Sequence, residues 1–184
     1  MTGQGLLILC CIFYLIWWYR GFRPGITVNR VGGSNGLLLL ITAALGIAGM
    51  AMSLMPVPEI LPPKISSTLI ITGGIAAYIG LLLLTRFVFQ RIVTTELILI
   101  VGWTMLELTV ISKLNAAGFL SDQGFWFMCF VIVAAFIISM ILYVAYYRME
   151  EMKAFYAAMV PLVTEALSMA VLMICLVISG QTGV

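Results

Sequence analysis

Residues 124–147 read GFWFMCFVIVAAFIISMILYVAYY, twenty-four residues without one charged side chain. An α-helix of this length is about 36 Å long, enough to cross a hydrocarbon core about 30 Å thick. A helix suits that setting because it satisfies its own backbone hydrogen bonds where no water is present. This stretch therefore predicts that the chain crosses a membrane.

Five further apolar stretches of similar kind precede and follow it. They span residues 2–19, 36–55, 67–89, 95–112 and 154–179. Of the 184 residues, 64% are hydrophobic and 9% are charged, whereas roughly a quarter of the residues in a soluble domain are charged. We therefore expect an all-α integral membrane protein, a bundle of about six transmembrane helices with short loops, forming a single domain over residues 1–184.

The connections carry turn-forming residues. Those residues are Arg23-Pro24-Gly25 and Gly32-Gly33-Ser34-Asn35, then Pro56, Pro58, Pro62 and Pro63, and finally Asn115 and Gly118. The third and fifth connections are very short, so each should join two antiparallel neighbours. Helices 36–55 and 67–89 are both rich in glycine and alanine, and small residues let membrane helices approach closely. We expect these two helices to be in tight contact with each other.

The basic residues predict the orientation in the membrane. With alternating sides, seven fall on one side and two on the other: Arg20, Arg23, Arg30, Arg86, Arg91, Arg148 and Lys153 against Lys64 and Lys113. Cytoplasmic loops carry an excess of Lys and Arg, and Trp and Tyr favour the headgroup level. Trp17, Trp18, Tyr19, Tyr146, Tyr147 and Tyr156 gather at the more basic boundary. Both termini are therefore predicted outside, in a plasma or inner membrane.

Two acids lie deep inside apolar stretches. Glu107 and Glu165 each stand about ten residues, or roughly 15 Å, from the nearer cytoplasmic helix end. A carboxylate there costs at least a few kcal/mol, so such residues face the protein interior, carry a proton or bind a cation. Their matching depth near the bilayer midplane predicts a shared site.

Helical spacing adds neighbours to these acids. Glu96, Trp103 and Glu107 share one face of their helix, and Pro161 and Ser168 share a face with Glu165. Pro161 has no backbone N–H and so frees a carbonyl one turn earlier. We predict a ligand-binding pocket formed by Trp103, Glu107, Pro161, Glu165 and Ser168, able to hold a cation, a proton or an ammonium group. The competing interpretation is that both acids are neutral and only fix helix packing.

Several function classes are disfavoured by what the sequence lacks. Histidine is absent, and Cys10, Cys11, Cys129 and Cys175 form no CxxC pair. Haem ligation, common zinc sites, catalytic triads and thiol relays thereby lose their usual residues. No cofactor is expected, and the metal question stays open. The small net charge of +2 predicts no nucleic-acid partner.

Three hypotheses for the function follow. The first is a small transporter or membrane-embedded solute-binding subunit, whose intramembrane carboxylates bind a cation, proton or small solute. The second is a non-catalytic helical subunit or scaffold of a larger membrane complex, which suits the short loops. An enzyme acting on lipid is the least favoured, because no nucleophile stands beside a base. Expected partners are the lipid bilayer, a small solute or ion, and other membrane proteins or further copies of this chain.

Overall fold

The computed structural model describes residues 2–25, 32–55, 58–90 and 95–182, and within them it is built from helices. The six long helices are α1 (Thr2–Phe22), α2 (Gly33–Ser53), α3 (Ser67–Leu83), α4 (Thr95–Ala116), α5 (Asp122–Ala145) and α6 (Glu151–Thr182). A π-helical turn, η1 (Leu84–Val88), continues α3, and a 3-10 turn, η2 (Tyr146–Arg148), follows α5. No strand occurs in these four ranges.

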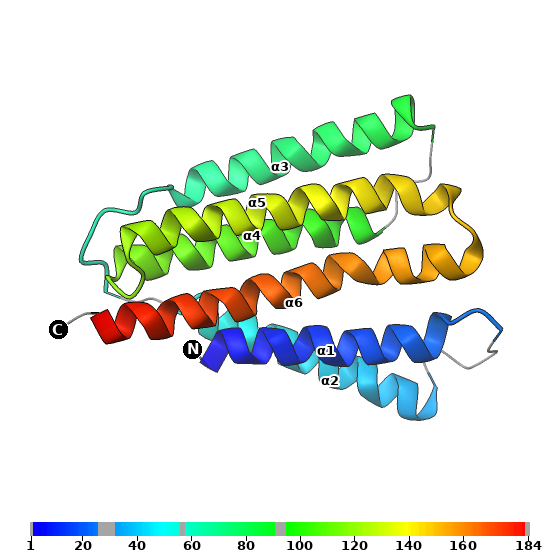
Figure 1. Ribbon diagram of the computed structural model, residues 1–184, viewed down its shortest axis with the longest axis horizontal. Helices are drawn as coiled ribbons and strands as arrows, with labels where there is room; N and C mark the ends of the chain where they lie inside the picture. Colours follow the sequence, from blue (N-terminus) through cyan, green and yellow to red (C-terminus); the bar gives the residue numbers. More distant parts are fainter. Residues whose placement is uncertain (1, 26–31, 56–57, 91–94, 183–184) are drawn as a thin grey trace.

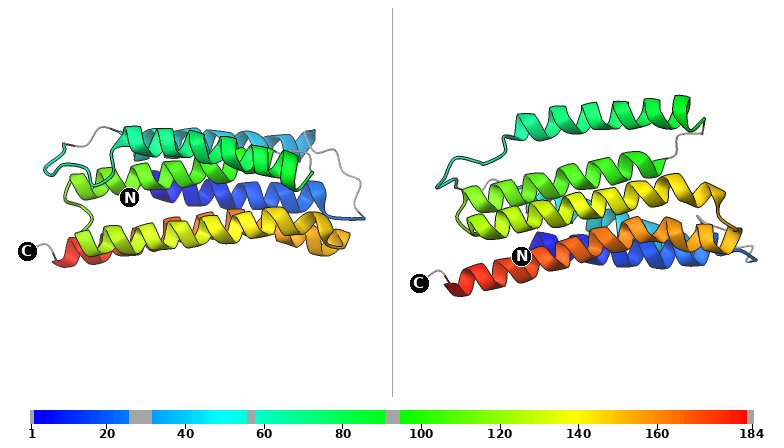
Figure 2. Two further views of the ribbon diagram at one scale, coloured as in Figure 1. Left: turned by 90° about the horizontal axis from the view of Figure 1, so that it is seen from above. Right: turned by 45° about the horizontal axis from the view of Figure 1, so that its top comes forward.

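The helices lie side by side and alternate in direction along the chain (Figure 1). Each helix contacts the next in the series α3, α4, α5, α6, α1 and α2, so the first helix of the chain packs against the last. Both termini lie toward the same end of the bundle, as an even number of antiparallel helices requires (Figure 1). The further views in Figure 2 show α3 at one margin of the assembly, with α4 beside it.

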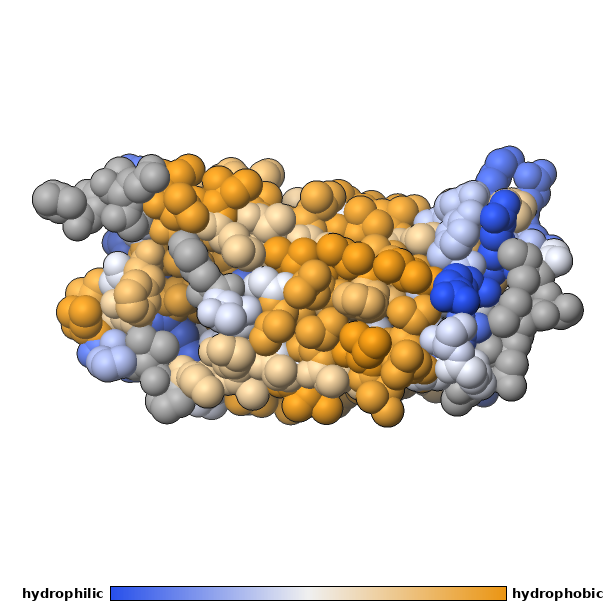
Figure 3. All heavy atoms as spheres, turned by 90° about the horizontal axis from the view of Figure 1, so that it is seen from below, coloured by the Kyte–Doolittle hydropathy of each residue, from blue (hydrophilic) through white to orange (hydrophobic). Residues whose placement is uncertain are grey.

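Six helical segments are long and apolar enough to cross a membrane, and they indicate a multi-pass membrane protein. Figure 3 shows a broad apolar surface over the middle of the molecule, with hydrophilic residues gathered most densely at the end where α1 and α5 finish. Large apolar side chains such as Leu40, Ile47 and Phe130 are more than 60% exposed. Lipid is the solvent that such a surface fits.

The observed helices extend beyond several of the predicted limits. α4 runs four residues past the predicted end at Ser112, to Ala116, because Lys113 and Asn115 still fit a helical end turn. The turn that follows contains Gly118 at φ +76°, a left-handed conformation that glycine adopts without steric cost. Gly118 therefore lies in a turn as predicted, whereas Asn115 lies in the last turn of α4. Of the residues named in the sequence analysis, Arg30, Pro56 and Arg91 lie outside the described residues.

The predicted tight contact between the second and third helices is wrong. α2 packs against α1, and α3 packs against α4. A Cβ added at Gly49 of α2 would lie 2.9 Å from Cγ of Leu7, and one at Gly46 would lie 3.2 Å from Sγ of Cys10. The small residues of α2 thus pack against α1, where Gly3 in turn lies close to Ser53 and to the Gly49 carbonyl. Gly74 of α3 similarly accommodates the Met105 side chain of α4.

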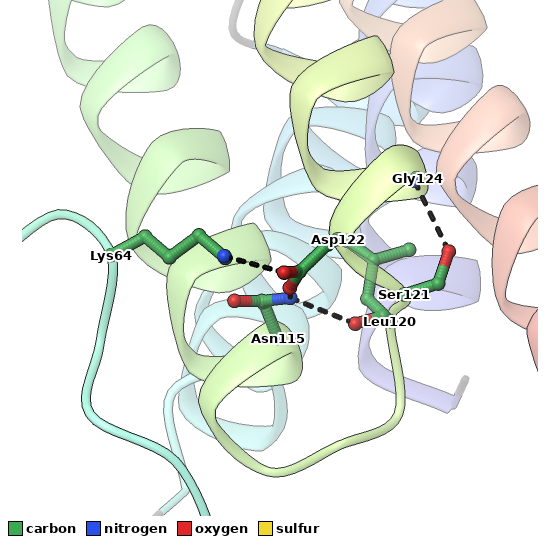
Figure 4. Close-up of polar contacts among 6 residues, drawn as sticks. All are labelled: Lys64, Asn115, Leu120, Ser121, Asp122 and Gly124. Atoms are coloured by element: carbon green, nitrogen blue, oxygen red, sulfur yellow. Dashed lines mark hydrogen bonds and ion pairs between the residues drawn. The ribbon is translucent and has the colours of Figure 1, made fainter.

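The segment between α2 and α3 is fixed to the turn between α4 and α5 (Figure 4). The backbone N–H groups of Ile60 and Leu61 each donate to the carbonyl of Ala116 at 2.8 Å. Lys64 forms an ion pair with Asp122 at 2.7 Å. Asn115, which is buried, donates to the Leu120 carbonyl at 2.9 Å and to the Asp122 carboxylate at 3.1 Å. These contacts fix the segment that leads from α2, which packs against α1, to α3, which packs against α4.

The close approach of α1 and α2 gives a first prediction. Gly49→Ala should destabilise the protein by about 1–3 kcal/mol, because the added methyl meets both the side chain and the backbone of Leu7. Gly5→Ala is the matched control, since a Cβ there meets nothing within 4 Å, and it should be neutral or stabilising by up to about 1 kcal/mol. Thermal unfolding in a mild detergent measures both, and equal effects would contradict the observed interface.

The loop anchor gives a second prediction. Asn115→Ala removes two hydrogen bonds at a buried position and should cost about 1–3 kcal/mol, because the Leu120 carbonyl loses its donor. Lys64→Ala breaks an ion pair between more exposed groups and should cost less than about 1 kcal/mol. The same unfolding measurement ranks the two variants, and a larger loss for Lys64→Ala would overturn this account of the anchor.

Candidate functional site

The two intramembrane acids lie inside the protein, well away from the ends of their helices. Glu107 stands in α4 and is 2% exposed, and Glu165 stands in α6 and is 5% exposed. Neither reaches the rim of the bundle. A buried carboxyl group needs compensating partners or a proton, so the surroundings of each side chain decide what it can do.

One oxygen of Glu107 is held by two donors. The indole Nε1 of Trp103 donates to its Oε1 at 3.3 Å, and the hydroxyl of Ser168 on α6 donates to the same atom. The second oxygen, Oε2, is buried and has no hydrogen-bond partner among the described residues. Glu107 therefore links α4 to α6 while half of its accepting capacity stays unused.

Ser168 lies between the two acids. Its hydroxyl contacts Glu107 Oε1 and also the backbone carbonyl of Glu165, the latter at 2.8 Å. A hydroxyl has one hydrogen and can donate to only one of these oxygens at a time. A proton on Glu107 would let the carboxyl donate to Ser168 while Ser168 donates to the carbonyl. The arrangement is thus suited to a carboxyl group that gains and loses a proton.

Glu165 faces a cavity instead of a donor. No described side chain donates a hydrogen bond to its carboxyl group, and the residue lines a cavity of about 150 Å³. Trp103 and Pro161 line the same cavity, whereas Glu107 and Ser168 lie behind its wall. The structure therefore brings all five predicted residues together, three at the cavity surface and two in the layer that supports it.

The cavity is lined by helices from both ends of the chain. Its lining residues are Cys10, Cys11, Tyr14 and Trp18 of α1, Glu96, Leu99, Ile100 and Trp103 of α4, Tyr143 and Tyr146 near the end of α5, and Ala157, Ala158, Pro161, Leu162 and Glu165 of α6. Because Glu96 begins α4 and Trp18 lies near the end of α1, the cavity extends from mid-bundle toward the basic end. The contribution of α1 was not predicted.

Pro161 shapes the α6 wall of the cavity. It lies inside the helix, and because it lacks an N–H the Ala157 carbonyl loses its usual helical donor. Thr164 donates to the Pro161 carbonyl at 2.7 Å, and its hydroxyl lies 3.3 Å from that of Ser139 on α5. Polar groups of α6 are thereby held around the turn that carries Glu165.

Sequence reasoning missed most of the aromatic wall. Trp18 and Tyr146 were assigned to the headgroup boundary, and Tyr14 and Tyr143 were not singled out. The Tyr146 hydroxyl donates to Glu96 at 2.8 Å, so this aromatic residue has a role inside the bundle. One sequence signal could have indicated the contribution of α1. Cys10, Tyr14 and Trp18 are spaced four residues apart, which places them along one face of the helix.

Metal coordination by a cluster of acids is not favoured here. Over the part of the chain that the structure describes, no three His, Cys, Asp or Glu side chains lie close enough together to hold a metal ion. The site can instead offer single carboxyl groups in a cavity whose lining is mostly apolar. Such a site suits one positive charge or one proton.

Comparisons with protein-family models, with curated proteins and with solved structures found no match to this chain. The site is therefore interpreted from its own geometry.

The link between α4 and α6 can be tested by a double-mutant cycle. Ser168→Ala should lower the free energy of unfolding by about 1–2 kcal/mol in the natural chain, because Glu107 loses a donor. In a Glu107→Leu background the same substitution should cost much less, giving a coupling energy of at least about 0.5 kcal/mol. Unfolding of the four proteins in detergent provides the values, and purely additive effects would refute the contact.

Proposed function

We propose that this protein is a small membrane transporter or membrane-embedded solute-binding subunit, in which Glu165 binds a positively charged solute or a proton. The observation that carries the proposal is the Glu165 carboxyl, which is 5% exposed, lacks a described donor and lines a cavity. A carboxyl group placed only for packing would be expected to have its partner within the protein. Glu165 instead faces the cavity, where a ligand could serve as its partner.

Glu107 is proposed as a positioning residue. Its hydrogen bond with Trp103 fixes the indole that forms part of the cavity wall, and its contact with Ser168 fixes the turn of α6 that carries Glu165. Exchange of a proton on Glu107 would change which of these contacts form. This offers a route by which a proton could be coupled to occupancy of the cavity.

The orientation proposed for this function places the more basic end in the cytoplasm. Among described residues, Arg20, Arg23, Arg86, Arg148 and Lys153 lie at one end of the bundle, and Lys64 and Lys113 lie at the other. The positive-inside rule then places both termini outside, in a plasma or inner membrane. The cavity would extend from the middle of the membrane toward the cytoplasm.

Neutralising the acids tests the proposal. The purified chain in lipid nanodiscs is screened by thermal stabilisation against Na⁺, K⁺, small ammonium compounds and a pH series. Glu165→Gln should weaken binding of the stabilising cation at least about tenfold, because a charged partner is lost. Glu107→Gln should also weaken it, while Glu151→Gln on the exposed first turn of α6 should have no effect.

A transported cation should also accumulate in proteoliposomes that contain the natural chain, and not in those with Glu165→Gln. Size-exclusion chromatography and unfolding temperature confirm that each variant is folded. Unchanged binding and uptake in the Glu107→Gln, Glu165→Gln double variant would refute the proposal. Stable partner chains in native membranes, with no solute effect, would favour the scaffold function instead.

A further inference from the structure

The cavity wall combines acids with aromatic rings. Two carboxyl-bearing residues, Glu96 and Glu165, line it together with five aromatic residues: Tyr14, Trp18, Trp103, Tyr143 and Tyr146. Among the described residues that line the cavity there is no lysine or arginine. The ionisable groups among these described lining residues are all acids, which disfavours an anionic solute.

The arrangement also disfavours a bare multivalent metal ion. Ca²⁺ takes six to eight oxygen ligands and Mg²⁺ demands a near-octahedral set, whereas no cluster of three candidate ligands occurs in the described residues. A neutral apolar molecule would fit the rings but would leave Glu165 without compensation. The class of solute that remains is a molecule with one positive charge on an apolar body.

Aromatic rings add to the attraction for such a molecule. The faces of Trp and Tyr are negative and attract organic cations, most strongly when water is excluded. Trp103 is held in place by Glu107, and Tyr146 is held by its hydrogen bond to Glu96. Both rings are thus oriented before a ligand arrives, which lowers the entropic cost of binding.

The size of the cavity limits the body of the ligand. An apolar protein cavity of about 150 Å³ holds a benzene-sized molecule, and the cavity beside Glu165 has about this volume. Glu96 stands in the first turn of α4, at the end of the cavity nearer the basic loops. A second acid on the way to Glu165 would favour entry of cations from that end.

We propose that the solute is a compact monovalent organic cation, with its ammonium group at Glu165 and its apolar body against Trp103 and Tyr14. This inference rests on the proposed function and names the chemical class of its substrate. It assigns the aromatic wall a recognition role that a proton or alkali-ion site would not need.

A charge series on one skeleton tests the inference in the natural chain. Benzylammonium, benzyl alcohol and benzoate are measured by equilibrium dialysis against the protein in nanodiscs, with empty nanodiscs subtracted. Benzylammonium should bind at least tenfold more tightly than benzyl alcohol, and benzoate should not bind measurably. Tighter binding of either benzyl alcohol or benzoate would overturn the inference.

Two variant pairs locate the bound cation. Glu165→Gln should weaken benzylammonium binding at least tenfold and leave benzyl alcohol within about threefold. Tyr14→Leu should weaken benzylammonium by about threefold to thirtyfold through loss of the ring face, whereas Tyr14→Phe, which keeps the ring, should stay within about threefold. Equal effects of Leu and Phe at position 14 would contradict the aromatic contact.

The outcomes distinguish a failure of this inference from a failure of the proposed function on which it rests. If Na⁺ or protons bind in a Glu165-dependent manner and benzylammonium does not, the inference fails and the proposed function survives. If no cation in either series depends on Glu165 or Glu107, both fail. Because the charge series uses the unaltered chain, a variant that does not fold leaves the main comparison intact.

Discussion

The hydrogen-bonded contact of Glu107 with Trp103 and Ser168 is the constraint on which the interior of this bundle depends. An acid in an apolar interior is costly unless other groups compensate it. The two donors come from one turn earlier on α4 and from α6, so the acid links these two helices. Glu165 faces the cavity, whereas the buried Oε2 of Glu107, which has no hydrogen-bond partner among the described residues, lies behind the cavity wall.

The helices divide by their relation to this interior. α1, α4, α5 and α6 supply the cavity wall and most of the buried core, which includes Leu7, Val110, Phe125 and Met169. α2 and α3 lie outside, each packed mainly on one neighbour through glycines. Their exposed apolar side chains suit lipid contact, so sequence changes there should bear on stability more than on the site.

The sequence predicted the six helical segments because length and apolar content alone decide what lipid can solvate. It also predicted the proximity of Glu107, Trp103 and Ser168, because helical spacing and matching depth are encoded locally. It did not predict which helices are neighbours. Glycine shows where a helix can be approached closely, but Gly49 does not reveal that its partner is α1. The aromatic wall was missed because Trp18 also fits a headgroup boundary.

The order of the helices has a consequence for biogenesis. Glu107 and Ser168 are separated by 61 residues, which a ribosome adds in roughly three to twelve seconds. For most of that interval α4 is already made, and α6, which completes its surroundings, is not. The nascent acid must therefore be sheltered, by a proton or by the insertion machinery, until the last span arrives and closes the bundle around it.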